Sequence, residues 1–270
     1  MRARLEVNAM RFATVGLAIV VLFLAGGCGG TSGADRTKTA AAGQPTPTAP
    51  VRTSTVPATA AATVQPPAIS IDVPAANSNV HVPIEVRGSS NVFEGVLSVQ
   101  LQQTDGTLLC ERRVQSTSGT GTPGTWQTTI AVPPVSASQG TIRAFSRSAR
   151  DGSEENVVTR NVTIVADAPA IVILTPACNV DIAAGTGLRV TGTASVFEAA
   201  LSLDLRNADG MVVASQPVTA DAGAPARGSW SAMLNISSLP AGLYELTAFD
   251  LSARDGSREN EFSIPLRITV

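Results

Sequence analysis

GSSNVFEGVLSVQLQQTDG (residues 88–106) and SARDGS (148–153) belong to one stretch that the chain contains twice. The second version runs GTASVFEAALSLDLRNADG (192–210) and ends in a second SARDGS (252–257). The offset is 104 positions throughout, and 24 of the 69 residues from 88 to 156 are identical to their counterparts without a gap. Self-similarity of this kind indicates a duplicated folding unit, so we expect two domains of the same fold.

Each copy is predicted to be all-β. Short runs of alternating apolar residues, such as Leu97, Val99 and Leu101, are separated by turn residues every 8–12 positions. The period of two places such residues on one face of a strand, and Asp105-Gly106 is a strong turn signal because both residues tolerate positive φ. The spacing predicts two β-sandwiches in tandem, over 67–166 and 167–270.

The N-terminus is predicted to be an export signal, residues 1–27. Three arginines precede a 13-residue apolar run (12–24) that is too short to span a bilayer comfortably. Leu24-Ala25-Gly26-Gly27-Cys28 follows and resembles a bacterial lipobox, with the large aliphatic residue one place early. The resemblance implies that Cys28 is lipidated and becomes the mature N-terminus; an ordinary signal peptide with an incidental cysteine is the alternative. We therefore expect a protein that is lipid-anchored to the cell membrane on its extracytoplasmic face.

Residues 28–66 are predicted to be a disordered tether. They are rich in Thr, Ala, Pro, Gly and Ser and contain no aromatic residue. Such a composition cannot bury enough apolar surface to offset the entropy of ordering. If the prolines keep it extended, it would reach about 110–120 Å at about 3.1 Å per residue.

The repeated marks resemble one known family. Phe-Glu before a strand, a central Asp-Gly, an aromatic after a Gly-rich loop and Ser-x-x-Asp-Gly-Ser near the end are similar to the immunoglobulin-like domain of bacterial spore-germination proteins, often found beside a GerMN domain. The resemblance implies immunoglobulin-like sandwiches in a cell-envelope setting and carries no established catalysis. No GerMN domain accompanies the repeats in this sequence.

Eight positions recur in both copies as candidates for a shared interaction site or for a structural role: Phe93, Glu94, Arg150 and Asp151, with Phe197, Glu198, Arg254 and Asp255. A ligand or calcium site would need roughly six to eight oxygens, and only two of these recurring positions in each copy are acidic. We favour structure: the aspartates should bond their own turns, and Arg150 should pair with Glu94. A function confined to one copy would instead lie in the loop 116–123 or 220–227.

Other residues yield no catalytic or metal site. His81, the only histidine, is expected at an exposed strand edge without a nucleophile motif. Trp126 and Trp230 could be sugar-stacking platforms, but each opens an apolar strand and fits core packing better. Cysteine and histidine lack metal-site spacing, and we expect no metal and no cofactor.

Cys110 and Cys178 are the cysteines that remain besides Cys28. Export favours oxidation, which would join them in an inter-domain disulfide. They are not equivalent in the repeats, since Cys110 aligns with Ala214 inside a strand and Cys178 lies in a loop. This inequivalence favours two separate thiols over a bridge.

The sequence therefore predicts a non-enzymatic interaction or structural module of the cell envelope. The formal net charge of −2 and the absence of a basic stripe argue against nucleic acid as a partner. The membrane is reached through the N-terminal lipid, and an envelope protein or wall polymer is the expected partner. The alternative is an extracytoplasmic lipoprotein that binds carbohydrate or a small molecule through the turn carboxylates or the tryptophans. A link to spore germination rests on the family resemblance.

Overall fold

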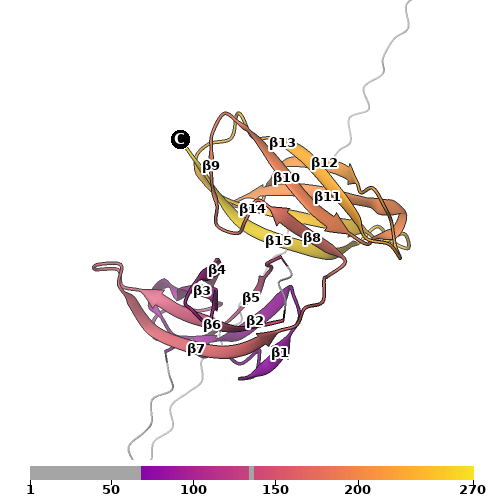
Figure 1. Ribbon diagram of the computed structural model, residues 1–270. Helices are drawn as coiled ribbons and strands as arrows, with labels where there is room; N and C mark the ends of the chain where they lie inside the picture. Colours follow the sequence, from indigo (N-terminus) through magenta and orange to yellow (C-terminus); the bar gives the residue numbers. More distant parts are fainter. Residues whose placement is uncertain (1–67, 134–136) are drawn as a thin grey trace, which may run out of the picture. The chain divides into compact units, whose positions relative to one another are not determined.

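The computed structural model describes residues 68–133 and 137–270, which form two β-sandwiches built on one plan (Figure 1). The predicted signal peptide, Cys28 and the tether lie outside the described residues. Within the described part, regular helix is limited to two three-residue 3-10 turns, Phe93–Gly95 and Phe197–Ala199. Among these residues, no helix is long and apolar enough to cross a bilayer.

The first sandwich packs a small sheet against a large one. The small sheet is the antiparallel pair β2 and β5, joined at its edge by isolated bridges from Ile69 and Val73. The large sheet has the order β1-β7-β6-β3-β4. The strands are β1 (Ser78–Val80), β2 (Ile84–Ser90), β3 (Val96–Gln103), β4 (Leu108–Gln115), β5 (Gly124–Ile130), β6 (Ser138–Arg147) and β7 (Glu154–Ile164).

The second sandwich repeats this topology with a longer first strand. Its sheets have the orders β13-β10-β8 and β12-β11-β14-β15-β9. The strands are β8 (Ile171–Thr175), β9 (Asp181–Ala183), β10 (Gly187–Ala194), β11 (Ala200–Asn207), β12 (Val212–Thr219), β13 (Gly228–Asn235), β14 (Gly242–Leu251) and β15 (Arg258–Thr269). The all-β prediction is confirmed, although sequence reasoning missed the three-residue strands β1 and β9, which are too short to show a periodicity.

The cores follow the alternation of the strands. Leu97, Val99 and Leu101 are buried in the first sandwich, and the equivalent leucines of β11 are buried in the second. Each core contains one tryptophan: Trp126 is 3% exposed and Trp230 is 4% exposed. The indoles therefore pack in the core and offer no surface on which a sugar could stack, which confirms the packing interpretation.

A glycine lies opposite the tryptophan in each sandwich, Gly88 opposite Trp126 and Gly192 opposite Trp230. A Cβ built on Gly88 would lie 2.7 Å from Cζ2 of Trp126, and one on Gly192 would lie 2.6 Å from Cε2 of Trp230. Both would also overlap a backbone carbonyl of the neighbouring strand segment, that of Ser70 or Val172. Only glycine lets the indole and the adjacent segment approach at these positions.

Candidate functional site

The repeated residues gather at one end of each sandwich. Ser98 on β3 pairs with Phe145 on β6, and Val96 pairs with Gln115 on β4, so the start of β3 lies beside the ends of β6 and β4. Three loops therefore meet there: 91–95, 116–123 and 148–153. The second sandwich brings together 195–199, 220–227 and 252–257 in the same way. We call each set the loop end of its sandwich.

A tight turn at each loop end displays a phenylalanine. The side chain of Phe93 is 61% exposed and that of Phe197 is 68% exposed. The residue after each adopts a left-handed conformation, with φ of 54° at Glu94 and 52° at Glu198. A non-glycine residue with such a φ costs of the order of 1 kcal/mol or more and persists only where its surroundings hold it.

The neighbouring loop holds this turn through its backbone. In the first sandwich the Ser116 N–H donates to the Gly95 carbonyl at 2.8 Å, and the Gln115 amide donates to the Glu94 carbonyl at 2.7 Å. In the second sandwich the Ala220 N–H donates to the carbonyl of Ala199 at 2.9 Å. The exposed phenylalanines are thus fixed in position and are not carried on slack loops.

The two aspartates close the adjacent turn, as the structural interpretation predicted. One Asp151 carboxylate oxygen accepts from the Ser153 backbone N–H at 3.1 Å and from its hydroxyl at 2.7 Å. Asp255 accepts from Ser257 in the same way, at 3.0 and 2.7 Å. The serine hydroxyl first, and its N–H second, hold the pKa of each carboxyl below its ordinary value. Gly152 supplies the positive φ of 74° that the turn requires.

The predicted pairing of Arg150 with Glu94 is wrong. The Arg150 guanidinium lies 3.4 Å from its own neighbour Asp151, and the arginine side chain is 89% exposed. Glu94 is exposed, and the contact described at that residue runs through its backbone carbonyl. Arg150 lies near Asp151 because the two residues are adjacent in a tight turn. A pair between Arg150 and Glu94 would have to order two long side chains from different loops, at an entropic cost.

Replacing Asp255 with alanine should lower the melting temperature of the second sandwich by a few degrees, because it removes both side-chain hydrogen bonds with Ser257 that help to close the turn. Since the folded pKa is depressed, the charged form stabilises the fold above the unfolded pKa, and this stabilisation is lost as the pH falls through the folded pKa. The melting difference between wild type and Asp255→Ala should therefore shrink below about pH 4. Asp255→Asn, which keeps the turn geometry, serves as the control; equal melting of the alanine variant at neutral pH would contradict the structural role.

The remaining polar candidates do not build a catalytic or metal site in the described residues. His81 is exposed, as expected, and its Nδ1 lies 2.6 Å from a carboxylate oxygen of Asp167, which lies between the two sandwiches in sequence. Within residues 68–133 and 137–270, no group of three His, Cys, Asp or Glu side chains could hold a metal ion.

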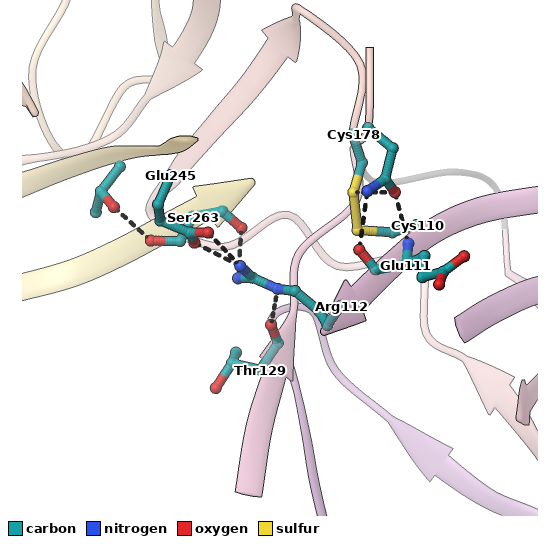
Figure 2. Close-up of polar contacts among 9 residues, drawn as sticks. Cys110, Glu111, Arg112, Thr129, Cys178, Glu245 and Ser263 are labelled. Atoms are coloured by element: carbon teal, nitrogen blue, oxygen red, sulfur yellow. Dashed lines mark hydrogen bonds and ion pairs between the residues drawn. A yellow bond between two sulfur atoms is a disulfide. The ribbon is translucent and has the colours of Figure 1, made fainter. Parts of the chain in front are cut away.

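A disulfide joins Cys110 on β4 to Cys178, which follows β8 (Figure 2). The expectation of two separate thiols is wrong. The expectation relied on the fact that the two cysteines occupy different positions in the repeat. Because the disulfide joins one sandwich to the other, its two cysteines do not need to occupy equivalent positions. The Cα atoms lie 5.3 Å apart, within the usual range for a bridge.

Two polar contacts flank the disulfide and join the same two sandwiches. The amide of Asn179 accepts from the Glu111 N–H at 2.6 Å and donates to the Glu111 carbonyl at 2.9 Å, so it pairs with the edge of β4 as another strand would. The Arg112 guanidinium donates to both Glu245 carboxylate oxygens, at 2.5 and 2.6 Å, and to the Ser263 carbonyl (Figure 2). We call the disulfide together with these two contacts the clasp.

Sequence reasoning found the cysteines of the clasp but missed its other members. Glu111, Arg112 and Glu245 have no counterpart of the same type in the other copy, and no local pattern marks them. Asn179 corresponds to Asn77, which has a similar positive φ, so the repeat gave no sign that Asn179 contacts the other sandwich. It also missed the buried aromatic on the outer face of each large sheet. Arginine guanidinium groups cover these rings, with Arg143 and Arg147 over Phe145 and Arg258 over Phe249. The repeated Ala-Phe step was the available signal for them.

The fold and the repeated turns coincide with one family. The family model for the immunoglobulin-like domain of bacterial spore germination, Gmad2, matches residues 68–153 and again 170–257. The two matches cover more than half of the chain, and the chain belongs to this family, with two of its domains in tandem. The turns described above fall within the matched ranges. A search of curated proteins found no match to the chain.

Solved structures with a similar arrangement include several proteins of low sequence identity. A biofilm-associated protein (BSP domain) is 16% identical, with a TM-score of 0.25 over 74% of this chain, and this chain covers 29% of that one. The fibronectin(III)-like modules of Clostridium thermocellum CbhA are 20% identical, with a TM-score of 0.24 over 74% of this chain and 94% of that one. Tandem immunoglobulin domains of titin are 13% identical, with a TM-score of 0.23 over 74% and 96%.

Proposed function

We propose that the protein is a non-enzymatic, lipid-anchored module of the cell envelope that binds a protein partner or wall polymer through its two loop ends. The observation that carries this proposal is the paired display of Phe93 and Phe197. Both side chains are more than half exposed, and both stand on a turn with a left-handed residue.

Core packing does not explain why both copies contain a phenylalanine at positions 93 and 197. Most of the identical positions in the two copies serve the fold: the glycines admit the tryptophans, the leucines fill the core, and the aspartates close turns. Phe93 and Phe197 bury little of their rings, yet the chain spends backbone strain to hold them. An exposed aromatic on a rigid loop supplies contact area at a low entropic cost on binding, which suits a binding surface.

The proposed address follows from the N-terminal sequence. Lipidation at Cys28 would anchor the chain on the extracytoplasmic face of the membrane, and residues 28–66 would carry the sandwiches away from it. A disulfide between the sandwiches suits an oxidising compartment outside the cytoplasm. A part in spore germination is the narrower form of the proposal; it rests on the family's description and requires a source that forms spores.

The alternative function, binding of carbohydrate or a small molecule, depended on free turn carboxylates or exposed tryptophans. The aspartates are engaged by their own turns, and the indoles are buried. The interaction module is therefore the function that the remaining surface supports best.

Changing both phenylalanines to serine should leave folding intact and remove partner binding. Because the rings bury little surface, the melting temperature of Phe93→Ser/Phe197→Ser should stay within about 2 °C of wild type. Removal of two exposed aromatic anchors should weaken retention of the envelope partner at least about tenfold. The measurement is quantitative recovery of the partner after crosslinking in intact cells, with Met233→Ser as the matched control, since Met233 is an exposed apolar residue on β13. Equal recovery from the double variant would exclude the loop ends as the binding surface.

A further inference from the structure

A cleft of about 1010 Å³ lies between the two sandwiches, beside the clasp. The first sandwich contributes the outer face of β3 and β4 and part of its loop end. The second contributes Asn179 and residues of β14 and β15, with Leu243 and Arg267 among them. The volume lies at the upper end of what ligand sites usually have, and the disulfide ties the two walls together.

The free edge of strand β4 lies next to this cleft. Strand β4 is the last strand of its sheet, and the Glu111 N–H and carbonyl point away from the sheet to the amide of Asn179. Alternate residues of a strand point the same way, so the N–H and carbonyl of Arg113 also point outward. In the described part of the chain, no hydrogen bond engages them. Asn179 occupies the outward-facing pairing position at Glu111, and the next such position along the edge, at Arg113, is open to an added strand.

The side chains around this open position favour an acidic ligand. Four arginines and three glutamates line the cleft, although the whole chain has a formal charge of −2. Arg112 and Glu245 neutralise each other, and Arg147 lies 3.6 Å from Glu111. Arg113 has no ion pair among the described residues, and Arg267 lies 3.9 Å from Asp181 with both side chains more than half exposed. Two guanidinium groups thus remain available, against one carboxylate, that of Glu94.

Exposed apolar side chains stand beside these arginines. Phe93 is 61% exposed, Leu108 is 45% exposed and Leu243 is 48% exposed, and all three line the cleft. An anionic polymer without apolar groups would leave these side chains unused. A peptide that alternates acidic and apolar residues would present its carboxylates to the arginines and its apolar side chains to these residues, because side chains alternate along an extended strand.

We propose that this cleft binds an extended acidic segment of a protein partner, which adds as a strand to the edge of β4 at Arg113 and directs carboxylates to Arg113 and Arg267. The backbone of β4 supplies the pairing, and the arginines select for acidic sequence. The cleft shares Phe93 with the first loop end, so its apolar contacts rest in part on the proposed function, whereas the strand pairing and the charge selection rest on Arg113 and Arg267, which lie outside both loop ends.

The test is a binding selection on the full chain, in detergent, with three synthetic ten-residue peptide pools. One pool alternates Glu with apolar residues, the second carries Lys in place of Glu, and the third is the acidic pool with alternate backbone amides N-methylated. We expect the acidic pool alone to bind, and Arg113→Glu/Arg267→Glu to reduce its affinity at least about tenfold. Arg189→Glu is the control, since Arg189 is exposed on β10 outside the cleft.

Three outcomes would overturn the proposal. Equal binding of the acidic and basic pools would remove the charge selection, and equal binding of the N-methylated pool would remove the strand pairing. Inorganic polyphosphate is the competing probe. If it binds, if its binding is lost in Arg113→Glu/Arg267→Glu, and if the acidic pool fails to bind, the cleft is a site for anionic polymers and not for a peptide.

Discussion

Changing Cys178 to alanine should release the two sandwiches from each other while each stays folded. The bridge closes a sequence separation of 68 residues, and the chain-entropy model gives such a link about 4 kcal/mol. Because it joins one sandwich to the other, the loss should fall mainly on their association. We expect an unchanged far-ultraviolet circular dichroism spectrum, a larger radius of gyration in small-angle X-ray scattering and separate thermal transitions for the two sandwiches.

Cys178→Ala is preferable to a change at Cys110, because Cys110 is fully buried and its loss would also disturb the first core. Reduction of the wild-type disulfide should reproduce the variant, which provides an independent control. Neither change alters the side chains of the Arg112–Glu245 ion pair or of Asn179, so the release would be due to the loss of the disulfide. If the scattering profile and the melting curve were unchanged, the disulfide would not be what holds the sandwiches together.

Changing Gly192 to alanine should destabilise the second sandwich by about 3 kcal/mol or more. The new Cβ would overlap both the Val172 carbonyl on β8 and the buried ring of Trp230. Neither can move cheaply, since β8 pairs with β10 across this point and the indole is 4% exposed. Urea unfolding followed by tryptophan fluorescence measures the effect, because each sandwich carries one tryptophan.

Gly242→Ala is the matched control for this substitution. It lies on β14 of the same sandwich, and a Cβ there would approach Cε2 of Tyr244 at 3.7 Å, an ordinary contact. The control should change stability by less than about 1 kcal/mol. A similar cost for both substitutions would mean that the close approach at Gly192 is not what requires a glycine.

Much of the fold could be predicted because its determinants are local. The alternation of Leu97, Val99 and Leu101 defines a buried strand face by itself, and Asp151-Gly152 closes a turn with its own side chain and backbone. The duplication then confirmed which marks matter to the fold, since both copies keep them. The turn role of the aspartates and the burial of the tryptophans followed from the same reasoning.

The clasp and the cleft could not be predicted, because they depend on how residues distant in sequence meet. Arg112 and Glu245 are separated by 133 positions, and each also differs in type from its counterpart in the repeat. Comparison of the copies therefore directed attention away from them. The exposure of Phe93 and Phe197 was equally hidden, since phenylalanine is among the residue types most often buried and no local pattern marks these two as exposed.

Site-specific photo-crosslinking in intact cells tests the central claim most directly. A photoreactive phenylalanine analogue is placed at position 197, with position 233 as the control, because both side chains are large, apolar and more than half exposed. We expect a discrete adduct with one envelope component from position 197 and none from position 233. The same adduct from both positions, or none from position 197 while the protein is present at the membrane, would contradict the claim that the loop ends are the binding surface.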